Sequence, residues 1–321
     1  KYQPDLAVFQ DLGTIERTNY QMYEARKKKV PIVVLILSWD NLTSKGMGAI
    51  QPDYFSVWNE RMRYELESYH EIDEESIFIN GNPVFDDHFS LLSKKNKDNK
   101  KKAQKIVLYA TGSPGWFKDI AKSLQPLLEA NSQGRIHSRV KFIVRMHPIF
   151  LMRSEQNEIF RKEIDELNTL AERFPGNIEL HYPQLHKRKE GYEFKNEDIL
   201  HYLNLLNGCD LLLTNFSTTM LEAAIFDKPI INIGYDSIRQ INLKTQVACT
   251  AENHIKHVME YNFLDIAKTE EEAIDLINMY LGNKDFKSDE RKKLRDNYCG
   301  VNAGNASQNI VDDIFSITLK N

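Results

Sequence analysis

Three hydroxyl-bearing residues in a row, Ser217, Thr218 and Thr219, could bind an anion. They lie between the apolar runs Asp210–Thr214 and Pro229–Ile233, which have no periodicity of their own. Such runs are typical of strands buried on both faces of a parallel sheet. The sequence therefore predicts a strand, a polar turn, a helix and a second strand.

The helix that follows the polar turn is indicated by Leu221, Ala224 and Ile225, which fall on one side at helical spacing. Hydroxyls at its start could cap it and leave backbone N–H groups for a phosphate, which the helix dipole also attracts. Glu222 comes one turn further on, so we expect it to contact hydroxyls attached to that phosphate. The ordinary alternative is a capped helix without a ligand.

A second polar pair, Arg145 and His147, ends the predicted strand in Lys141–Pro148. Ligands of open parallel sheets bind beyond the carboxyl ends of the strands, where the hydroxyl cluster is also expected. We therefore predict that both residues lie beside a diphosphate, although a lone His at a strand end is usually a surface residue. Thr111 and Gly112, which open the loop TGSPGW after a further strand, are assigned to the same nucleotide site.

Composition narrows the functional class. The chain has 321 residues, 41% hydrophobic and 27% charged, with a net charge of -4 and three widely spaced cysteines. These values are typical of a globular protein with two domains, and they disfavour nucleic-acid binding and zinc or disulfide frameworks. No apolar run approaches the ~18 residues of a membrane span, so we expect a cytoplasmic protein.

Several enzyme classes lack their sequence signatures. The chain has no GxxxxGK[ST], no GxGxxG after a strand, no HExxH and no GxSxG. These absences disfavour P-loop, nicotinamide-dependent, zinc-protease and hydrolase chemistry.

The first part of the chain alternates strands and helices, which predicts a parallel sheet. Strands are expected at Asp5–Gln10, Pro31–Leu37, Tyr54–Trp58 and Ser76–Ile79, and helices at Thr14–Lys29 and Glu60–Tyr69. Between Leu91 and Lys105 the chain carries seven lysines without apolar periodicity, which predicts a solvated linker. Weak attraction to an anionic membrane surface is the functional alternative for this run.

The second part alternates in the same way. A strand is expected at Ile106–Ala110, a helix through Leu128, a helix at Ser154–Arg173, a strand at Asn177–His181, a surface loop at His186–Lys195 and a helix at Glu197–Leu206. Helices should follow at Glu252–Tyr261, Thr269–Leu281, Ser288–Asn297 and Ala306–Ile317. We predict a first domain at 1–90, a linker at 91–104, a nucleotide-binding domain at 105–300 and a docking helix at 301–321.

The segments RMHP and NFSTTMLEA followed by DKPII, with a late GNASQNIVDDI helix, resemble the carboxyl-terminal half of two-domain GT-B transferases. The likeness is strongest to the bacterial cell-surface group that includes CDP-glycerol glycerophosphotransferases and CMP-sugar transferases. SWDNLTSKG, VWNERM and NGNPVFD resemble first-domain segments of surface-polysaccharide glycosyltransferases. The resemblance implies an α/β fold of two Rossmann-like domains, in which His147, Ser217 and Thr218 bind donor phosphates and Glu222 holds a ribose.

The implied function is transfer of a glycosyl or glycerophosphoryl group from a CMP-, CDP- or UDP-linked donor to a cell-surface polysaccharide or lipid-linked acceptor. No metal or further cofactor is expected, and weak contact with the inner face of the membrane is compatible with such an acceptor. The alternatives are a nucleotide-sugar isomerase of the UDP-N-acetylglucosamine 2-epimerase type and a non-catalytic nucleotide-binding module. First domains of these families hold more strands than we find here, so we expect the first domain to be incomplete at its amino terminus.

Transfer to a hydroxyl needs a base within about 3 Å of the proton, and the acceptor domain should supply it. We choose Asp40, which follows a buried strand in the polar loop SWDNLTSKG, with His147 as the catalytic residue of the donor side. Asp11 also follows a strand but leads into Gly13 and a helix, as a capping carboxylate does. The ordinary alternative for Asp40 is a side chain that closes a turn.

Overall fold

The computed structural model describes residues 3–94, 104–113, 117, 119–188, 191–235 and 250–320. They divide into two compact units. The first unit comprises Lys1–Lys94, Glu252–His257 and Lys293–Asn321, and the second comprises Lys95–Ala251 and Val258–Lys292. Most of the predicted lysine-rich linker, residues 95–103, lies outside the described residues.

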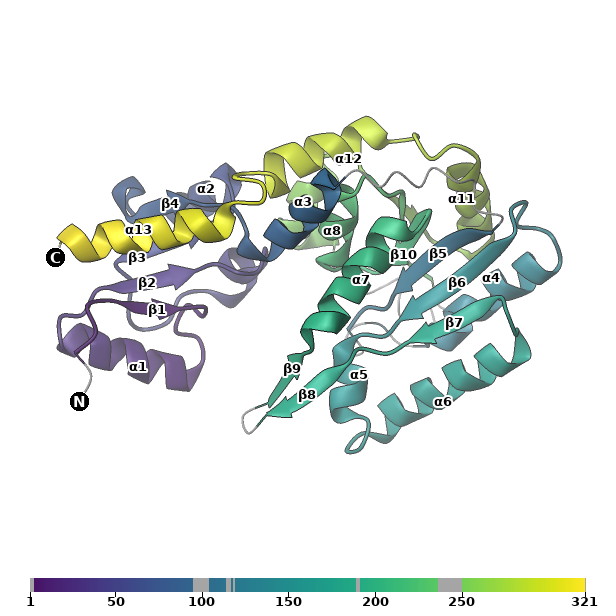
Figure 1. Cartoon of the computed structure of the whole chain (residues 1–321), viewed down its shortest axis with the longest axis horizontal. Helices are drawn as coiled ribbons and strands as arrows, with labels where there is room; N and C mark the ends of the chain where they lie inside the picture. The colour runs from purple at the N-terminus through teal and green to yellow at the C-terminus, as the bar shows by residue number, and fades with distance from the viewer. Residues whose placement is uncertain are drawn as a thin grey trace. The chain divides into compact units, whose positions relative to one another are not determined.

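The first unit contains a four-stranded parallel sheet in the order β1-β2-β3-β4 (Figure 1). The strands are β1 (Ala7–Phe9), β2 (Ile32–Leu35), β3 (Tyr54–Val57) and β4 (Ile77–Ile79), and the helices between and after them are α1 (Glu16–Lys27), α2 (Glu60–His70) and α3 (Asp86–Ser93). Each strand pairs in parallel with the next one in the sequence. The predicted alternation is therefore confirmed.

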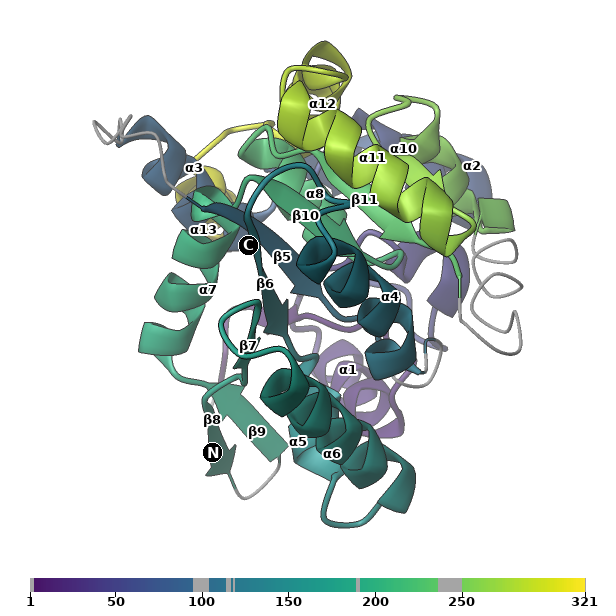
Figure 2. The ribbon, with the colours of Figure 1, turned by 90° about the vertical axis from the view of Figure 1, so that its right-hand side faces the viewer.

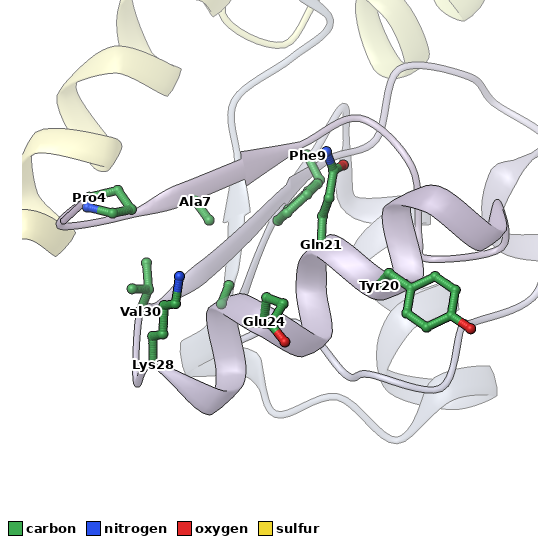
Figure 3. Close-up of a pocket in the computed structure, with 9 residues that line it drawn as sticks. Pro4, Ala7, Phe9, Tyr20, Gln21, Glu24, Lys28 and Val30 are labelled. Atoms are coloured by element: carbon green, nitrogen blue, oxygen red, sulfur yellow. The ribbon is translucent and has the colours of Figure 1, made fainter. Parts of the chain in front are cut away.

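A groove of about 490 Å³ runs between β1 and α1 at one edge of this sheet (Figure 3). Figure 3 shows Phe9 of the strand and Tyr20 and Glu24 of the helix among its lining side chains. None of the side chains that the sequence assigns to a functional site lines this groove.

The carboxyl-terminal segment folds with the first unit. Helix α13 (Ala306–Lys320) begins where the backbone N–H groups of Ala306 and Ser307 donate to the Asp86 carboxylate at 3.0 and 2.9 Å. Asn59 donates through Nδ2 to the carbonyl of Tyr298 at 2.8 Å. The docking helix predicted for the end of the chain therefore packs on the first unit, and the segment that accompanies it begins at Lys293.

The second unit contains a six-stranded parallel sheet in the order β12-β11-β10-β5-β6-β7. Its strands are β5 (Lys105–Ala110), β6 (Val140–Arg145), β7 (Ile178–His181), β10 (Leu211–Thr214), β11 (Ile230–Ile233) and β12 (Asp265–Ala267). The chain builds the sheet outward from β5 to β7, then returns to the other side of β5 and continues through β12. This order is that of a doubly wound, Rossmann-like sheet, so the prediction of two Rossmann-like units is confirmed.

Helices cover both faces of this second sheet. One face packs in a single apolar core against α4 (Ile120–Ser132), α6 (Glu158–Arg173) and α11 (Glu270–Gly282), which lie in front of the strands in Figure 2. The other face contacts α7 (Asn196–Gly208) and α8 (Thr219–Ile225). The strands are buried on both faces, as their unbroken apolar runs predict.

Several elements differ from the sequence prediction. The expected surface loop at His186–Lys195 is wrong, because β8 (Leu185–Arg188) and β9 (Gly191–Phe194) form an antiparallel hairpin. Leu185 lies opposite Phe194, and Arg188 forms an ion pair with Glu193, so cross-strand contacts support the hairpin. Helix α3 and the short elements β12 and α5 (Pro148–Arg153) were also not predicted from the sequence.

The remaining helices occur where the sequence predicts them. They are α10 (Asn253–Met259) and α12 (Ser288–Leu294), and a π-helical turn at Arg295–Cys299 follows the second of them.

Candidate functional site

The second sheet reverses its strand order between β5 and β10, and the predicted nucleotide-site residues gather at this reversal. Thr214 at the end of β10 pairs with Ala110 at the end of β5, which pairs with Arg145 at the end of β6. The segments that follow these three strands therefore leave the sheet side by side at its carboxyl edge. In open α/β sheets the crevice at such a reversal is the place where ligands bind.

The two segments that flank the reversal are tied together by Asn215. Its side chain is 1% exposed, donates through Nδ2 to the carbonyl of Ile233 at 2.9 Å and accepts the N–H of Gly112 through Oδ1 at 3.2 Å. A Cβ atom on Gly112 would lie 2.6 Å from the ring of Phe117 and 3.0 Å from Asn215 Oδ1. Gly112 therefore allows the two segments to approach each other closely.

The polar turn, residues 215–219, presents backbone donors. The Ser217 hydroxyl lies 3.3 Å from the Thr214 hydroxyl, and Thr218, the residue before α8, makes no capping bond with its side chain. The expected hydroxyl cap is therefore absent at that position. Within the described part of the chain, the backbone N–H groups of Ser217, Thr218 and Thr219 donate to no protein acceptor. Three backbone N–H groups are thus available for an oxyanion, whereas the Ser217 hydroxyl already lies near Thr214 and the Thr219 side chain hydrogen-bonds Tyr202.

His147 follows β6 and is held in one tautomer. Its backbone N–H donates to the Thr111 hydroxyl at 2.8 Å, and its Nδ1 accepts the N–H of Ile149 at 3.3 Å at the start of α5. Nδ1 therefore carries no proton, and a neutral ring must carry it on Nε2. Burial lowers the pKa of His147, which favours this neutral form. The side chain is thus a hydrogen-bond donor, suited to a phosphate oxygen.

Arg145 does not present a free guanidinium, contrary to the sequence expectation. Its side chain is 9% exposed and forms a two-pronged ion pair with Asp198 of α7, in which Nη1 lies 2.9 Å from Oδ1 and Nη2 also contacts Oδ2. The same Nη1 lies 2.7 Å from His181 Nδ1. The charge of Arg145 is therefore balanced inside the protein.

Asp198 is ionised in this arrangement. Burial opposes its ionisation, but hydrogen bonds from Arg145 and from the N–H of Gln184, together with the Arg145 charge, outweigh it and hold the pKa of Asp198 below its usual value. The pair fixes the start of α7 against β6.

Glu222 lies on α8, half-buried, and accepts a hydrogen bond from the phenol of Tyr202. Burial and the neighbouring carboxylate raise the pKa of Tyr202 well above its usual value, so the phenol stays protonated and donates. The sequence analysis missed Asn215, Asp198 and Tyr202. The four-residue spacing of Asp198 and Tyr202 places both on one face of α7, and this spacing was the available signal.

Asp40 belongs to the first unit and closes its own loop. Its Oδ1 accepts the Ser38 hydroxyl, and its Oδ2 accepts the Ser44 hydroxyl at 3.2 Å and lies 3.7 Å from Lys45 Nζ. Burial opposes ionisation, but the Ser38 bond and the charges of Lys45 and His254 outweigh it, so the pKa of Asp40 lies below its usual value. The carboxylate is ionised but weakly basic, and these contacts match the turn-closing alternative.

His254 packs on the same loop of the first unit, and the sequence analysis missed it. Its Nδ1 lies 3.4 Å from the Thr43 hydroxyl, and its ring meets Trp39 edge-on at 5.0 Å. Burial lowers the pKa of His254 despite the carboxylates of Asp40 and Glu252. No local pattern connects a histidine to a loop more than 200 residues earlier in the chain.

No group of three or more His, Cys, Asp or Glu side chains among the described residues is arranged to hold a metal ion. No helix among these residues has the length and apolar character needed to cross a bilayer.

Comparison with protein families gives one match. Residues 178–316 match the family described as CDP-Glycerol:Poly(glycerophosphate) glycerophosphotransferase. The matched region contains Asp198, Tyr202, the polar turn and Glu222. The resemblance that the sequence suggested is thereby confirmed. Curated protein sequences give no significant match.

Comparison with solved structures shows the same fold at low sequence identity. A UDP-GlcNAc 2-epimerase from Methanocaldococcus jannaschii is 16% identical with a TM-score of 0.59, and the match covers 98% of this chain and 77% of that one. The enzyme of the same name from Neisseria meningitidis, bound to UDP-GlcNAc, is 17% identical with a TM-score of 0.58, over 99% and 76% of the two chains. A variant of the wall teichoic acid polymerase TagF is 14% identical with a TM-score of 0.53, over 99% and 90%.

Proposed function

We propose, from the glycerophosphotransferase domain that residues 178–316 carry, that this chain is a GT-B transferase. It moves a glycerophosphoryl or glycosyl group from a nucleotide-activated donor to a cell-surface polysaccharide or lipid-linked acceptor. The observation that carries the proposal is the overlap of this domain with the polar turn and Glu222 at the strand-order reversal.

The donor that fits the family description is CDP-glycerol. An acceptor hydroxyl oxygen attacks the β-phosphorus, the bond from that phosphorus to the bridging oxygen breaks, and CMP leaves. The hydroxyl proton passes to a base. The N–H groups of Ser217–Thr219 and Nε2–H of His147 donate to the phosphate oxygens and stabilise the charge that develops on CMP. Thr111 supports this role because its hydroxyl holds the His147 backbone.

The base comes from the first unit in this proposal. Asp40 is our candidate, because it is ionised and lies in a polar loop after β2. Its lowered pKa makes it a weak base, so His254, which packs on the same loop, is the second candidate. Separate substitution of the two residues distinguishes them.

We propose that the transfer needs no metal ion, since N–H donors and a neutral histidine suffice to bind the diphosphate. Activity that survives exhaustive treatment with EDTA would agree with this. Activity lost to EDTA and restored by Mg²⁺ would contradict it.

We also propose a cytoplasmic protein with weak contact to anionic membranes. The lysine-rich run between Leu91 and Lys105 supports the contact. The hairpin adds exposed Tyr192 and Phe194 close to Lys187 and Arg188. Co-sedimentation with vesicles that contain phosphatidylglycerol, but not with neutral vesicles, is the expected result. Equal sedimentation with both would contradict it.

The fold likeness to UDP-GlcNAc 2-epimerases favours a second candidate, a nucleotide-sugar isomerase. An isomerase consumes its sugar nucleotide without an acceptor, whereas a transferase releases CMP from CDP-glycerol only when acceptor is present. A non-catalytic nucleotide-binding module does neither. Measuring CMP release with and without a glycerophosphate-primed acceptor separates the transferase from both alternatives, and consumption of a sugar nucleotide without acceptor separates the isomerase from the binding module.

A further inference from the structure

The contacts around Glu222 suggest a role for a residue that no sequence signal had assigned. We propose that Tyr202 positions Glu222 to bind the hydroxyls of the donor's ribose, and that the Arg145–Asp198 pair holds Tyr202 in place. This inference rests on the proposed function, because it assumes that a nucleotide occupies the site at the reversal.

Helices α7 and α8 are in direct contact through Tyr202 and Glu222. The Tyr202 phenol donates to Oε2 of Glu222, and the two residues lie 20 positions apart in the chain. A donated hydrogen bond to one carboxylate oxygen restricts rotation of the glutamate side chain. The carboxylate then keeps one orientation before the ligand arrives.

The Tyr202 ring is itself held by the Arg145–Asp198 pair. The Arg145 guanidinium lies 5.6 Å from the centre of the Tyr202 ring, and Asp198 binds that guanidinium with both oxygens. Asp198 also accepts the N–H of Gln184. Residues from β6, α7 and the segment before β8 therefore fix the position of the ring.

A carboxylate such as that of Glu222 is well suited to bind a ribose. A carboxylate accepts hydrogen bonds from the 2′- and 3′-hydroxyls of a ribose, and bonds to a charged acceptor are among the strong ones. A carboxylate held in one orientation loses less side-chain entropy on binding than a mobile one. Removing only the Tyr202 hydroxyl should therefore reduce the preference for ribonucleotides without removing Glu222.

The experiment compares the affinity of CMP with that of 2′,3′-dideoxy-CMP by calorimetry on the full chain. The parent protein should favour CMP by at least about 10-fold. Glu222→Gln should bring the ratio close to one, and Tyr202→Phe should reduce it several-fold. The double variant should behave as Glu222→Gln alone does, because the two residues act through one contact.

Tyr182→Phe is the matched control. The Tyr182 phenol donates to Asn168 at 3.1 Å in the same unit, and no contact joins it to Glu222 within the described residues. This variant should keep the parent's ratio. Thermal unfolding of each variant identifies any general loss of structure.

Two results overturn the proposal in distinguishable ways. A Tyr202→Phe protein that keeps the parent's ratio while Glu222→Gln loses it would refute the positioning role and leave the proposed function intact. A parent that binds none of CMP, UMP or GMP, or that binds each as well as its dideoxy form, would refute the nucleotide site itself.

Discussion

The two parallel sheets differ in strand order, and this difference determines what their carboxyl edges can do. The first sheet runs β1-β2-β3-β4 in one direction, whereas the second reverses between β5 and β10. At a reversal the loops on the two sides diverge and leave a crevice. The polar turn that borders it keeps three backbone N–H groups without protein acceptors in the described part of the chain.

The corresponding edge of the first sheet carries the Asp40 carboxylate in the loop after β2. The loop after β2 turns back on itself, and the Asp40 carboxylate accepts from Ser38 and Ser44. The second unit thus has backbone donors without protein acceptors beside its strand-order reversal, within the described residues, whereas the Asp40 carboxylate of the first unit is already hydrogen-bonded within its own loop. If the donor binds to the second unit, as we propose, substitutions in the two units should have different consequences.

The largest expected effect is a loss of stability when the buried ion pair of the second unit is broken. Asp198→Asn leaves Arg145 without its charged partner, which should lower the free energy of unfolding at pH 7 by about 3–5 kcal/mol. Because the pKa of Asp198 is lowered on folding, its contribution is complete above pH ~4 and is lost as the pH falls through the folded value. Urea unfolding at several pH values measures both effects.

The control for this substitution is Arg188→Ala, which removes the exposed pair with Glu193 in the hairpin. An exposed pair should contribute at most ~1 kcal/mol. Equal decreases in the free energy of unfolding for the two variants would show that the buried Arg145–Asp198 pair stabilises the protein no more than an exposed pair does.

The next largest expected effect is a loss of turnover caused by a substitution in the first unit. If Asp40 is the base, Asp40→Asn should lower turnover by about 10²-fold or more while donor affinity stays unchanged. His254→Gln is the parallel variant, because His254 packs on the same loop. Turnover within a few-fold of the parent for Asp40→Asn, with a large loss for His254→Gln, would transfer the role to the histidine.

A smaller effect is expected at the phosphate site. His147→Ala should weaken nucleotide binding by roughly 1.5–3 kcal/mol, the range for a hydrogen bond to a charged group. His186→Ala, in the exposed hairpin, should leave the affinity unchanged. A folded His147→Ala protein that binds nucleotide as tightly as the parent would leave His147 with only a structural role.

The smallest effect is the dependence of stability on pH. Burial lowers the pKa of His147 and His181, so the unfolded chain binds their protons more tightly than the folded protein does. Both residues should therefore reduce stability as the pH falls below about 6.5, until the folded imidazoles protonate. His147→Gln and His181→Gln should each make thermal stability less sensitive to pH between 7.5 and 5.5. An unchanged pH profile in both variants would contradict the assignment.

The sequence predicts the architecture well because buried parallel strands leave a clear trace. Unbroken apolar runs such as Pro31–Leu37 and Pro229–Ile233 coincide with β2 and β11, whose bounds differ from the runs by only a few residues. Strand order was not predictable, because nothing local shows that β10 pairs with β5 rather than with β7.

The site was predictable only in part, for a related reason. Ser217 and His147 follow strands directly, so their place at the carboxyl edge follows from the alternation of strands and helices. Whether the Arg145 guanidinium is open to a ligand depends on Asp198. This residue lies 53 positions further along the chain and contacts Arg145 only in the folded protein. The role of Tyr202 was not predictable for the same reason, because its hydrogen-bond partner Glu222 is on another helix.

We propose that the donor's diphosphate binds at the strand-order reversal of the second unit, and a crystal structure of the full chain with CDP-glycerol would show where it lies. Phosphate oxygens should lie within hydrogen-bond distance of the N–H groups of Ser217–Thr219 and of His147 Nε2. The ribose should lie next to Glu222. A donor bound elsewhere, for example in the groove between β1 and α1, with the polar turn empty, would show that this turn is not the donor site.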